Sequence, residues 1–239
     1  MNYKIIYRCF SGELYPHQFK HIRPKWFNKN ASFKSLVNSI NDSKIVTIDD
    51  LLVLHDGDKN EYSEYIEAIT NNIQYINVKS NEQSLLINYN IGDVLFNHNN
   101  VDIIYFIEDD YLHTKNAVHT ILRGTENFQL TTGFDHMDRY IRTDDLSKNK
   151  ESIAFSKKTN CHWRTVESTT CTWACTKDMW NQIKPDVLYY KLEDRSLFRS
   201  LINKSIRLWS PIPGVSTTVD INAMSPGIDW EQINKESLN

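Results

Sequence analysis

The sequence predicts a single α/β domain in which helices flank a mainly parallel central sheet. Apolar runs of strand length alternate with segments of helical periodicity from residue 3 to residue 110, an order typical of parallel strands joined by crossover helices. Two of these strands also end abruptly in carboxylates, at 56–58 and at 108–110. Ligands of open α/β sheets bind just outside the carboxyl ends of the strands, so the two strand ends indicate a binding site.

The first half of the chain holds the regular part of this pattern. Four apolar runs rich in β-branched and aromatic residues are expected to form strands: 3–10, 51–55, 74–78 and 102–110. Three segments with apolar residues at every third or fourth position are expected to form helices: 31–40, 61–72 and 85–96.

The second half is less regular. Three segments of helical character are expected to form helices: 114–123, 177–183 and 194–204. The remaining expectations are a strand at 128–133, a polar loop at 143–152 and strand-like pieces within 153–175. The tail from Ser210 carries several prolines and glycines, and we expect a long loop that covers the sheet.

Composition excludes several classes of function. The net charge of -3 and the pI near 6.2 argue against nucleic-acid binding as the main function. The N-terminus has no signal-peptide pattern, and no run of ~18 apolar residues predicts a membrane span. A cytoplasmic protein with free thiols is therefore expected. A zinc site built from Cys161, His162, Cys171 and Cys175 is the weaker alternative to buried thiols, because the paired Cys-x2-Cys spacing is missing.

The carboxylate triplet Glu108-Asp109-Asp110 is the most informative motif. Three like charges at one strand end repel one another and need compensation. Carboxylate oxygens suit Mg²⁺ or Mn²⁺, so the triplet favours a metal-dependent site for a phosphate-bearing ligand. The alternative is a solvated turn after a core strand.

Three further motifs carry candidate chemistry. Asp56 ends a strand, where its carboxylate can accept hydrogen bonds from a ribose or a base, or belong to a simple polar turn. Glu193-Asp194 opens a helix, which suits either a general base or ordinary dipole stabilisation. Trp163 and Trp173 have polar neighbours, which suits sugar rings, but both rings are also compatible with a core position.

The order of these motifs resembles the GT-A glycosyltransferases, most closely the inverting, family-2-like branch with its small phage and bacterial members. Glu108-Asp109-Asp110 is similar to the family's Asp-x-Asp metal motif, and Glu193-Asp194 to its Glu-Asp element. The resemblance implies a Rossmann-like GT-A fold, with a nucleotide-binding half at about 1–112 and an acceptor-binding half with a C-terminal loop at about 113–239. It also implies transfer of a sugar from a UDP- or GDP-sugar to a hydroxyl of a glycan or other acceptor, with inversion.

The resemblance assigns roles to particular residues. Asp110, supported by Glu108, would bind Mn²⁺ or Mg²⁺, and Asp194, with Glu193 beside it, would act on the acceptor hydroxyl as the catalytic base. The residues expected to bind the nucleotide sugar are Arg8, Asp56, Asn81, Ser84, Glu108 and Asp109. The residues expected to shape the acceptor or donor-sugar pocket are His162, Trp163, Arg164 and Trp173.

Two departures from the family pattern stand out. Many members place a metal-binding His in the C-terminal segment, but here Thr217-Thr218-Val219 occupies that region and no His follows residue 162. Asp220, Asp229 or water would have to complete the metal shell. The opening segment also differs from the usual Pro-x-Tyr-Asn, so that Arg8 would make a different contact with the nucleotide.

Two other functions stay open at this point. A non-catalytic carbohydrate-binding domain on the same scaffold is consistent with the missing His. A metal-dependent nucleotidyltransferase also uses carboxylates at strand ends, but it needs a basic cradle for a triphosphate, and the sequence has no Gly-rich loop with Lys or Arg.

Overall fold

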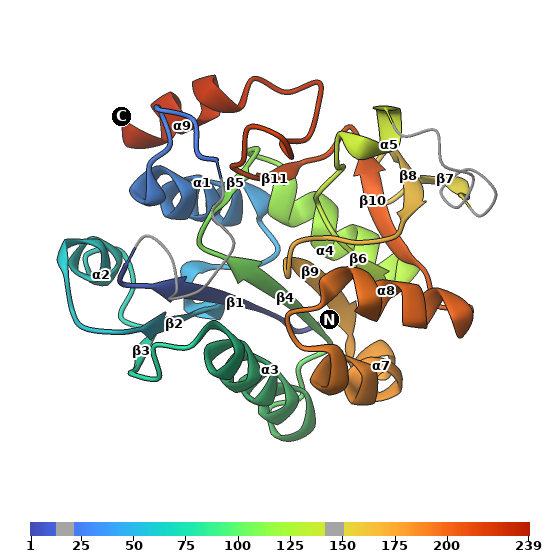
Figure 1. Cartoon of the computed structure of the whole chain (residues 1–239), viewed down its shortest axis with the longest axis horizontal. Helices are drawn as coiled ribbons and strands as arrows, with labels where there is room; N and C mark the ends of the chain where they lie inside the picture. Colours follow the sequence, from blue (N-terminus) through green and yellow to red (C-terminus); the bar gives the residue numbers. More distant parts are fainter. Residues whose placement is uncertain (13–21, 142–150) are drawn as a thin grey trace.

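A nine-stranded sheet forms the centre of the protein (Figure 1), in a computed structural model that describes residues 1–12, 22–141 and 151–239. The strands of its first half are β1 (Tyr3–Phe10), β2 (Leu51–Asp56), β3 (Ile73–Ile76) and β4 (Ile103–Glu108). Those of its second half are β6 (Leu130–Thr131), β7 (Ile153–Ser156), β8 (Cys161–Val166), β9 (Trp173–Thr176) and β10 (Leu208–Ile212). The strand order is β3-β2-β1-β4-β9-β6-β10-β8-β7.

The two halves of the sheet differ in strand direction. Strands β3, β2, β1 and β4 are all parallel, as predicted. In the other half, β6 and β10 are parallel, whereas the pairings of β9 with β4 and β6, and of β8 with β10 and β7, are antiparallel. The predicted α/β domain with a flanked central sheet is therefore confirmed, and its sheet is parallel in one half and mixed in the other.

Helices cover both faces of the sheet (Figure 1). On one face lie α1 (Lys29–Ser43) and α4 (Ala117–Phe128), and on the other lie α3 (Asn81–His98), α7 (Lys177–Tyr190) and α8 (Asp194–Asn203). Each face has its own apolar cluster: Phe33 and Ile121 belong to the first, and Tyr89 and Trp180 to the second. The shorter helices are η1 (Ile48–Asp50), α2 (Glu61–Glu67), α5 (Asp138–Ile141) and α9 (Trp230–Leu238).

The prediction of a long loop after Ser210 is wrong. This tail finishes β10, forms β11 (Ser216–Thr218), which pairs with β5 (Tyr111–His113), and ends in α9. Trp230 of α9 is buried against Leu112 and Val219 in a third apolar cluster. Tertiary contact stabilises these short elements, which lack a recognisable period in the sequence.

The bounds of most helices also differ from the prediction, and α2, α1 and α7 are examples. Helix α2 ends at Glu67 instead of residue 72, because the chain must turn to begin β3 beside β2. Helix α1 begins at Lys29, where Asn28 caps the free N–H groups of Asn30 and Ala31. Helix α7 continues through Pro185 to Tyr190. The polar loop predicted at 143–152 lies almost entirely outside the described residues.

Gly124 offers a test of the packing of α4 on the sheet. A Cβ atom at this position would lie 2.2 Å from Cη2 of Trp163, whose ring is completely buried. Alanine favours a helix over glycine by about 1 kcal/mol, but overpacking of a rigid core costs about 1–3 kcal/mol. We therefore expect Gly124→Ala to lower the free energy of unfolding, measured by urea denaturation. The double variant Gly124→Ala/Trp163→Phe should recover part of the loss, and strict additivity of the two changes would contradict this packing.

Candidate functional site

Polar side chains gather where β1, β2 and β4 end. The parallel register sets Arg8 of β1 beside Glu108 of β4, and Phe10 beside Asp56 of β2. The carboxylate triplet continues from Glu108 directly beyond β4. The two strand ends that the sequence singles out therefore lie at one edge of the sheet, on either side of β1.

Glu108 forms a two-point ion pair with Arg8. Arg8 donates from Nε to Oε1 at 3.0 Å and from Nη2 to Oε2 at 2.5 Å, and its side chain is only 3% exposed. Its third guanidinium nitrogen donates to the backbone oxygen of Asn81 at the start of α3. Burial raises the pKa of Glu108 to about 7, although Arg8 acts in the opposite direction. The predicted residues Arg8, Asn81 and Glu108 thus meet in one network.

Asp109 and Asp110 each have a cation of their own. Lys29 donates to Oδ2 of Asp109 at 2.7 Å, and the backbone N–H of Phe10 donates to the same atom. Arg23 donates to Oδ2 of Asp110 at 2.8 Å. Each member of the triplet is consequently neutralised by a basic side chain.

Within the described part of the chain, two predicted nucleotide-binding residues have a buried oxygen atom without a hydrogen-bond partner. Asp56 is fully buried, and its Oδ1 accepts from the backbone N–H groups of Val78 and Lys79, while Oδ2 has no partner among the residues that the structure describes. Oδ1 of Asn81 is also buried and has no partner in the described ranges. Buried acceptors are normally satisfied, so these two atoms are unusual at this edge of the sheet. Ser84 lies buried in the same first turn of α3 as Asn81.

Asp194 opens α8 next to the segment that precedes β9. Its Oδ2 accepts from the backbone N–H of Thr169 at 2.9 Å. Burial raises the pKa of Asp194 to about 8, whereas the backbone groups of Thr169 and Cys171 lower it. A carboxyl group with a pKa near neutrality is suited to general acid–base catalysis. Glu193, the neighbouring residue, is exposed and caps the helix without a side-chain hydrogen bond.

The segment 169–172 joins Asp194 to the carboxylate triplet. Thr172 accepts a hydrogen bond from the backbone N–H of Glu108 at 3.1 Å, and Thr170 bonds to the hydroxyl of Tyr111. Burial raises the pKa of the Cys171 thiol well above its usual value, and the charges of Asp194 and Glu108 raise it further. The candidate base therefore lies close to the strand-end residues.

The predicted acceptor residues do not form one group. Trp163 and Trp173 are buried in the core: Trp163 packs on Phe128, and Trp173 lies in the second apolar cluster. His162 is exposed, with its ring against Phe155. These positions leave no ring face of Trp163 or Trp173 exposed for a sugar.

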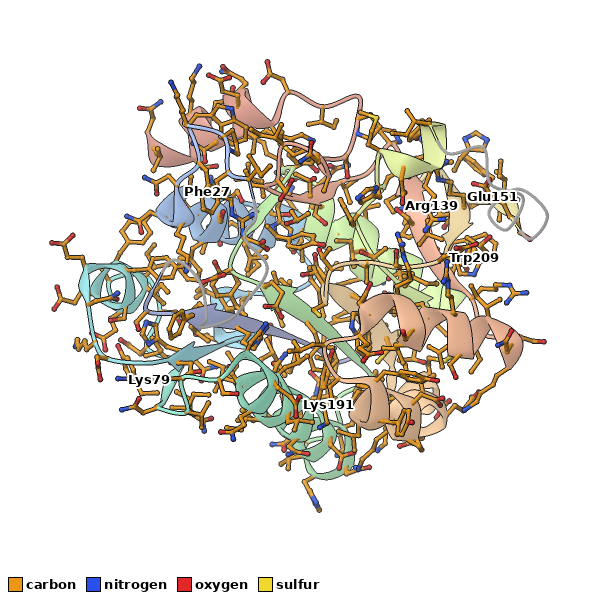
Figure 2. All side chains as sticks on the ribbon, viewed as in Figure 1. Phe27, Lys79, Arg139, Glu151, Lys191 and Trp209 are labelled. Carbon is orange, nitrogen blue, oxygen red and sulfur yellow. The ribbon has the colours of Figure 1, made fainter. Side chains whose placement is uncertain are left out.

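Arg164 has a different environment from its three companions. It forms a buried ion pair with Asp135 and lies over the ring of Tyr140 at 4.5 Å. Asp138, in the adjacent α5, contacts Arg195 next to Asp194 at 3.7 Å. Figure 2 labels Arg139 of α5 in this part of the molecule. Arg164 thus lies in a charged cluster beside the candidate base.

The donor set of the triplet does not fit a divalent cation well. Among the residues that the structure describes, no three His, Cys, Asp or Glu side chains converge on one point. Oδ2 of Asp110 is occupied by Arg23 and by the hydroxyl of Thr218 at 3.0 Å, so a metal ion there would have to displace both. The four cysteines are free thiols.

The two aspartates considered as substitutes for the missing His have other contacts. Asp220 accepts from the backbone N–H groups of Ile22 and Asn222, and Asp229 caps α9. Thr218 does approach Asp110, in the region where the family resemblance places a metal ligand.

Sequence reasoning missed Arg23 and Lys29. Both lie before or at the first turn of α1, outside any strand end, and their partners are 87 and 80 residues away in the sequence. The need for charge compensation was evident from the triplet, but the identity of the compensating groups was not. Neither residue belongs to a local sequence motif, so the sequence does not indicate that it contacts the triplet.

Comparisons with known proteins concern the fold only. The sequence matches no protein-family model and no curated protein. A CMP:2-keto-3-deoxy-manno-octonic acid synthetase complexed with CTP is 11% identical over 90% of this chain and 93% of its own, with a TM-score of 0.44. A cytidylyltransferase from Leptospira borgpetersenii is 12% identical over 80% and 68%, with a TM-score of 0.42. S. aureus TarS 1-349 is 11% identical over 88% of this chain, with a TM-score of 0.49, and this chain covers 58% of its length.

No helix in the described ranges has the length and apolar character that a membrane span requires.

Proposed function

We propose that this protein is a glycosyltransferase that moves a sugar from a nucleoside diphosphate sugar to a hydroxyl group, with inversion at the anomeric carbon. The observation that carries the proposal is the position of Asp194. A carboxyl group with a pKa of about 8 lies one short segment away from the strand-end network of Arg8 and Glu108. This combination would supply a base and a nucleotide site at the same edge of the sheet.

The strand-end residues would bind the donor. Oδ2 of Asp56 and Oδ1 of Asn81 are buried acceptors with no partner among the described residues, which suits the N–H groups of a base and the hydroxyls of a ribose. The ion pair between Arg8 and Glu108 would keep the ends of β1 and β4 in place beside the donor. The Mn²⁺ or Mg²⁺ predicted from the sequence is not part of the proposed step, because the carboxylates of the triplet are already paired.

Asp194 would act as the general base in a single displacement. The acceptor oxygen forms a bond to the anomeric carbon while the bond from that carbon to the diphosphate oxygen breaks. The hydroxyl proton passes to the carboxylate of Asp194, and the nucleoside diphosphate leaves with the electron pair of the broken bond. Attack opposite to the leaving group inverts the anomeric centre, and positioning of the two substrates supplies much of the rate.

The first test of the proposed function is a product assay. Purified protein is incubated with UDP-, GDP- and CDP-sugars selected by thermal shift, together with candidate hydroxyl acceptors. Release of a nucleoside diphosphate supports the proposal. A parallel incubation contains nucleoside triphosphates and a sugar, and release of pyrophosphate there would identify a nucleotidyltransferase instead. Binding without turnover in either incubation would identify a carbohydrate-binding domain.

Asp56→Asn tests the nucleotide site. The amide retains an oxygen for the N–H groups of Val78 and Lys79 but places an NH₂ donor at the position of Oδ2, where the proposed ligand would need an acceptor. We expect nucleotide affinity to fall by about tenfold or more, since a hydrogen bond to a charged group contributes ~1.5–3 kcal/mol. Calorimetric titration measures the change. Asp58→Asn is the matched control, because Asp58 lies in the same turn with an exposed side chain; equal affinities of the two variants would remove Asp56 from the site.

A further inference from the structure

We infer that Arg23 is a resident cation of the donor site and stabilises the diphosphate in place of a divalent metal ion. The inference rests on the proposed function and specifies how the same site neutralises its leaving group. Three cations compensate the triplet, and they differ in how many N–H groups they retain for a ligand.

Lys29 is saturated by its present contacts. An ammonium group has three donors, and Lys29 donates to the backbone oxygens of Phe10 and Gly12 and to Asp109. Arg8 is 3% exposed and directed at Glu108 and Asn81. Both cations therefore serve the protein itself and fix the polar edge of the sheet.

Arg23 has donors to spare and access to solvent. A guanidinium has five N–H groups, and two of them reach described acceptors, the backbone oxygen of Val219 and Oδ2 of Asp110. Its side chain is 22% exposed. Arg23 is thus the cation of the triplet that can bind an additional anion without breaking its ion pair.

The position of Arg23 is fixed by contacts on both sides. Its guanidinium carbon lies 5.0 Å from the centre of the Phe27 ring, which Figure 2 labels near the start of α1. The backbone of Ile22 bonds to the side chain of Asp220 and to the N–H of Ile221. A cation held in advance loses little freedom when it binds an anion, so the arrangement is suited to binding rather than only to charge balance.

The chemistry of a guanidinium fits a diphosphate. Its planar fork matches two phosphate oxygens at once, and it stays charged at every physiological pH. A preorganised cation beside the leaving group stabilises the negative charge that develops in the transition state. The unpaired oxygens of Asp56 and Asn81 lie at the same sheet edge and would hold the nucleoside end of that ligand.

The experiment is a titration of the intact protein with UDP, GDP and CDP and the matching monophosphates, in EDTA and in Mn²⁺. We expect a diphosphate to bind the wild type in EDTA with an affinity within about threefold of that in Mn²⁺. Arg23→Met should weaken diphosphate binding about tenfold or more, without rescue by Mn²⁺, and should change monophosphate binding far less. Arg23→Lys retains the charge but not the planar guanidinium. Its diphosphate affinity should lie between those of the wild type and Arg23→Met.

Arg207→Met is the matched control, since Arg207 also donates to a backbone oxygen but lies beyond α8. Thermal unfolding of each variant verifies the fold. Binding of a diphosphate only in Mn²⁺, with Arg23→Met equal to the wild type, would overturn the inference and leave the proposed function intact. Absence of nucleotide binding under both conditions would overturn both. A loss in Arg23→Met that is equal for mono- and diphosphates would also overturn the inference, because the effect would not depend on the second phosphate.

Discussion

Asp194→Asn is expected to abolish sugar transfer while leaving nucleotide binding unchanged. An amide of the same shape can still accept the hydrogen bond from Thr169, but it cannot take the proton of an acceptor hydroxyl. General-base catalysis contributes ~10²–10⁴-fold to the rate, so kcat should fall by at least ~100-fold. A radiolabelled transfer assay and a parallel nucleotide titration measure the two quantities.

Two control variants make this result specific. Asp178→Asn introduces the same change in the first turn of another helix, α7, at an exposed position, and should leave transfer unaffected. Glu193→Gln tests the exposed neighbour of Asp194. Full activity of Asp194→Asn together with inactive Glu193→Gln would assign the base to Glu193 instead.

The pH dependence of transfer follows from the same carboxyl group. Because burial raises the pKa of Asp194 to about 8, its basic form becomes more abundant as the pH rises through that value. We therefore expect kcat/KM to increase with pH and to level off above about pH 8. The folded state also binds this proton more tightly than the unfolded state, so this group favours folding below about pH 4 and loses that contribution between about pH 4 and pH 8. The decline in stability over that range should be shallower in Asp194→Asn.

The first half of the fold was predictable because its elements have clear periods. Strands β1, β2 and β4 are mainly apolar runs, and β2 and β4 end in carboxylates. Their parallel arrangement brings Arg8, Asp56 and Glu108 to one edge. Residues of distant sequence position therefore meet as a consequence of topology alone. The short strands β5 and β11 have three residues each, too few for a period to be recognised.

The site was less predictable than the fold. Trp163 and Trp173 have polar sequence neighbours, yet both rings are in the core, because alternation along a strand places neighbours on opposite faces. The negative charges of the triplet need a positive partner. From the sequence alone, a metal ion and a set of basic side chains are equally suitable partners. Only the tertiary structure shows that Arg23 reaches Asp110.

Arg8→Met is expected to destabilise the fold and to do so increasingly as the pH rises. Removal of one partner from a buried ion pair leaves the other charge uncompensated, at a typical loss of ~3–5 kcal/mol in the free energy of unfolding. Glu108 can escape part of this penalty by taking up a proton, since burial already raises its pKa to about 7 while Arg8 opposes that shift. Without Arg8 the pKa should rise further, so the loss should be smaller below about pH 6 than above pH 8. Urea denaturation at both pH values measures the difference.

Lys4→Met provides the control on the same strand. Lys4 pairs with Asp50, and both side chains are more than a quarter exposed, so the expected loss is below about 1 kcal/mol. The double variant Arg8→Met/Glu108→Gln should regain stability relative to Arg8→Met, because it removes the unpaired charge as well. Equal losses for Arg8→Met and Lys4→Met, without any pH dependence, would mean that Glu108 is not effectively buried. In that case Glu108 would be accessible to a ligand. The side chains at this edge of the sheet would then be held in place by the three hydrogen bonds of Lys29 and not by the Arg8–Glu108 pair.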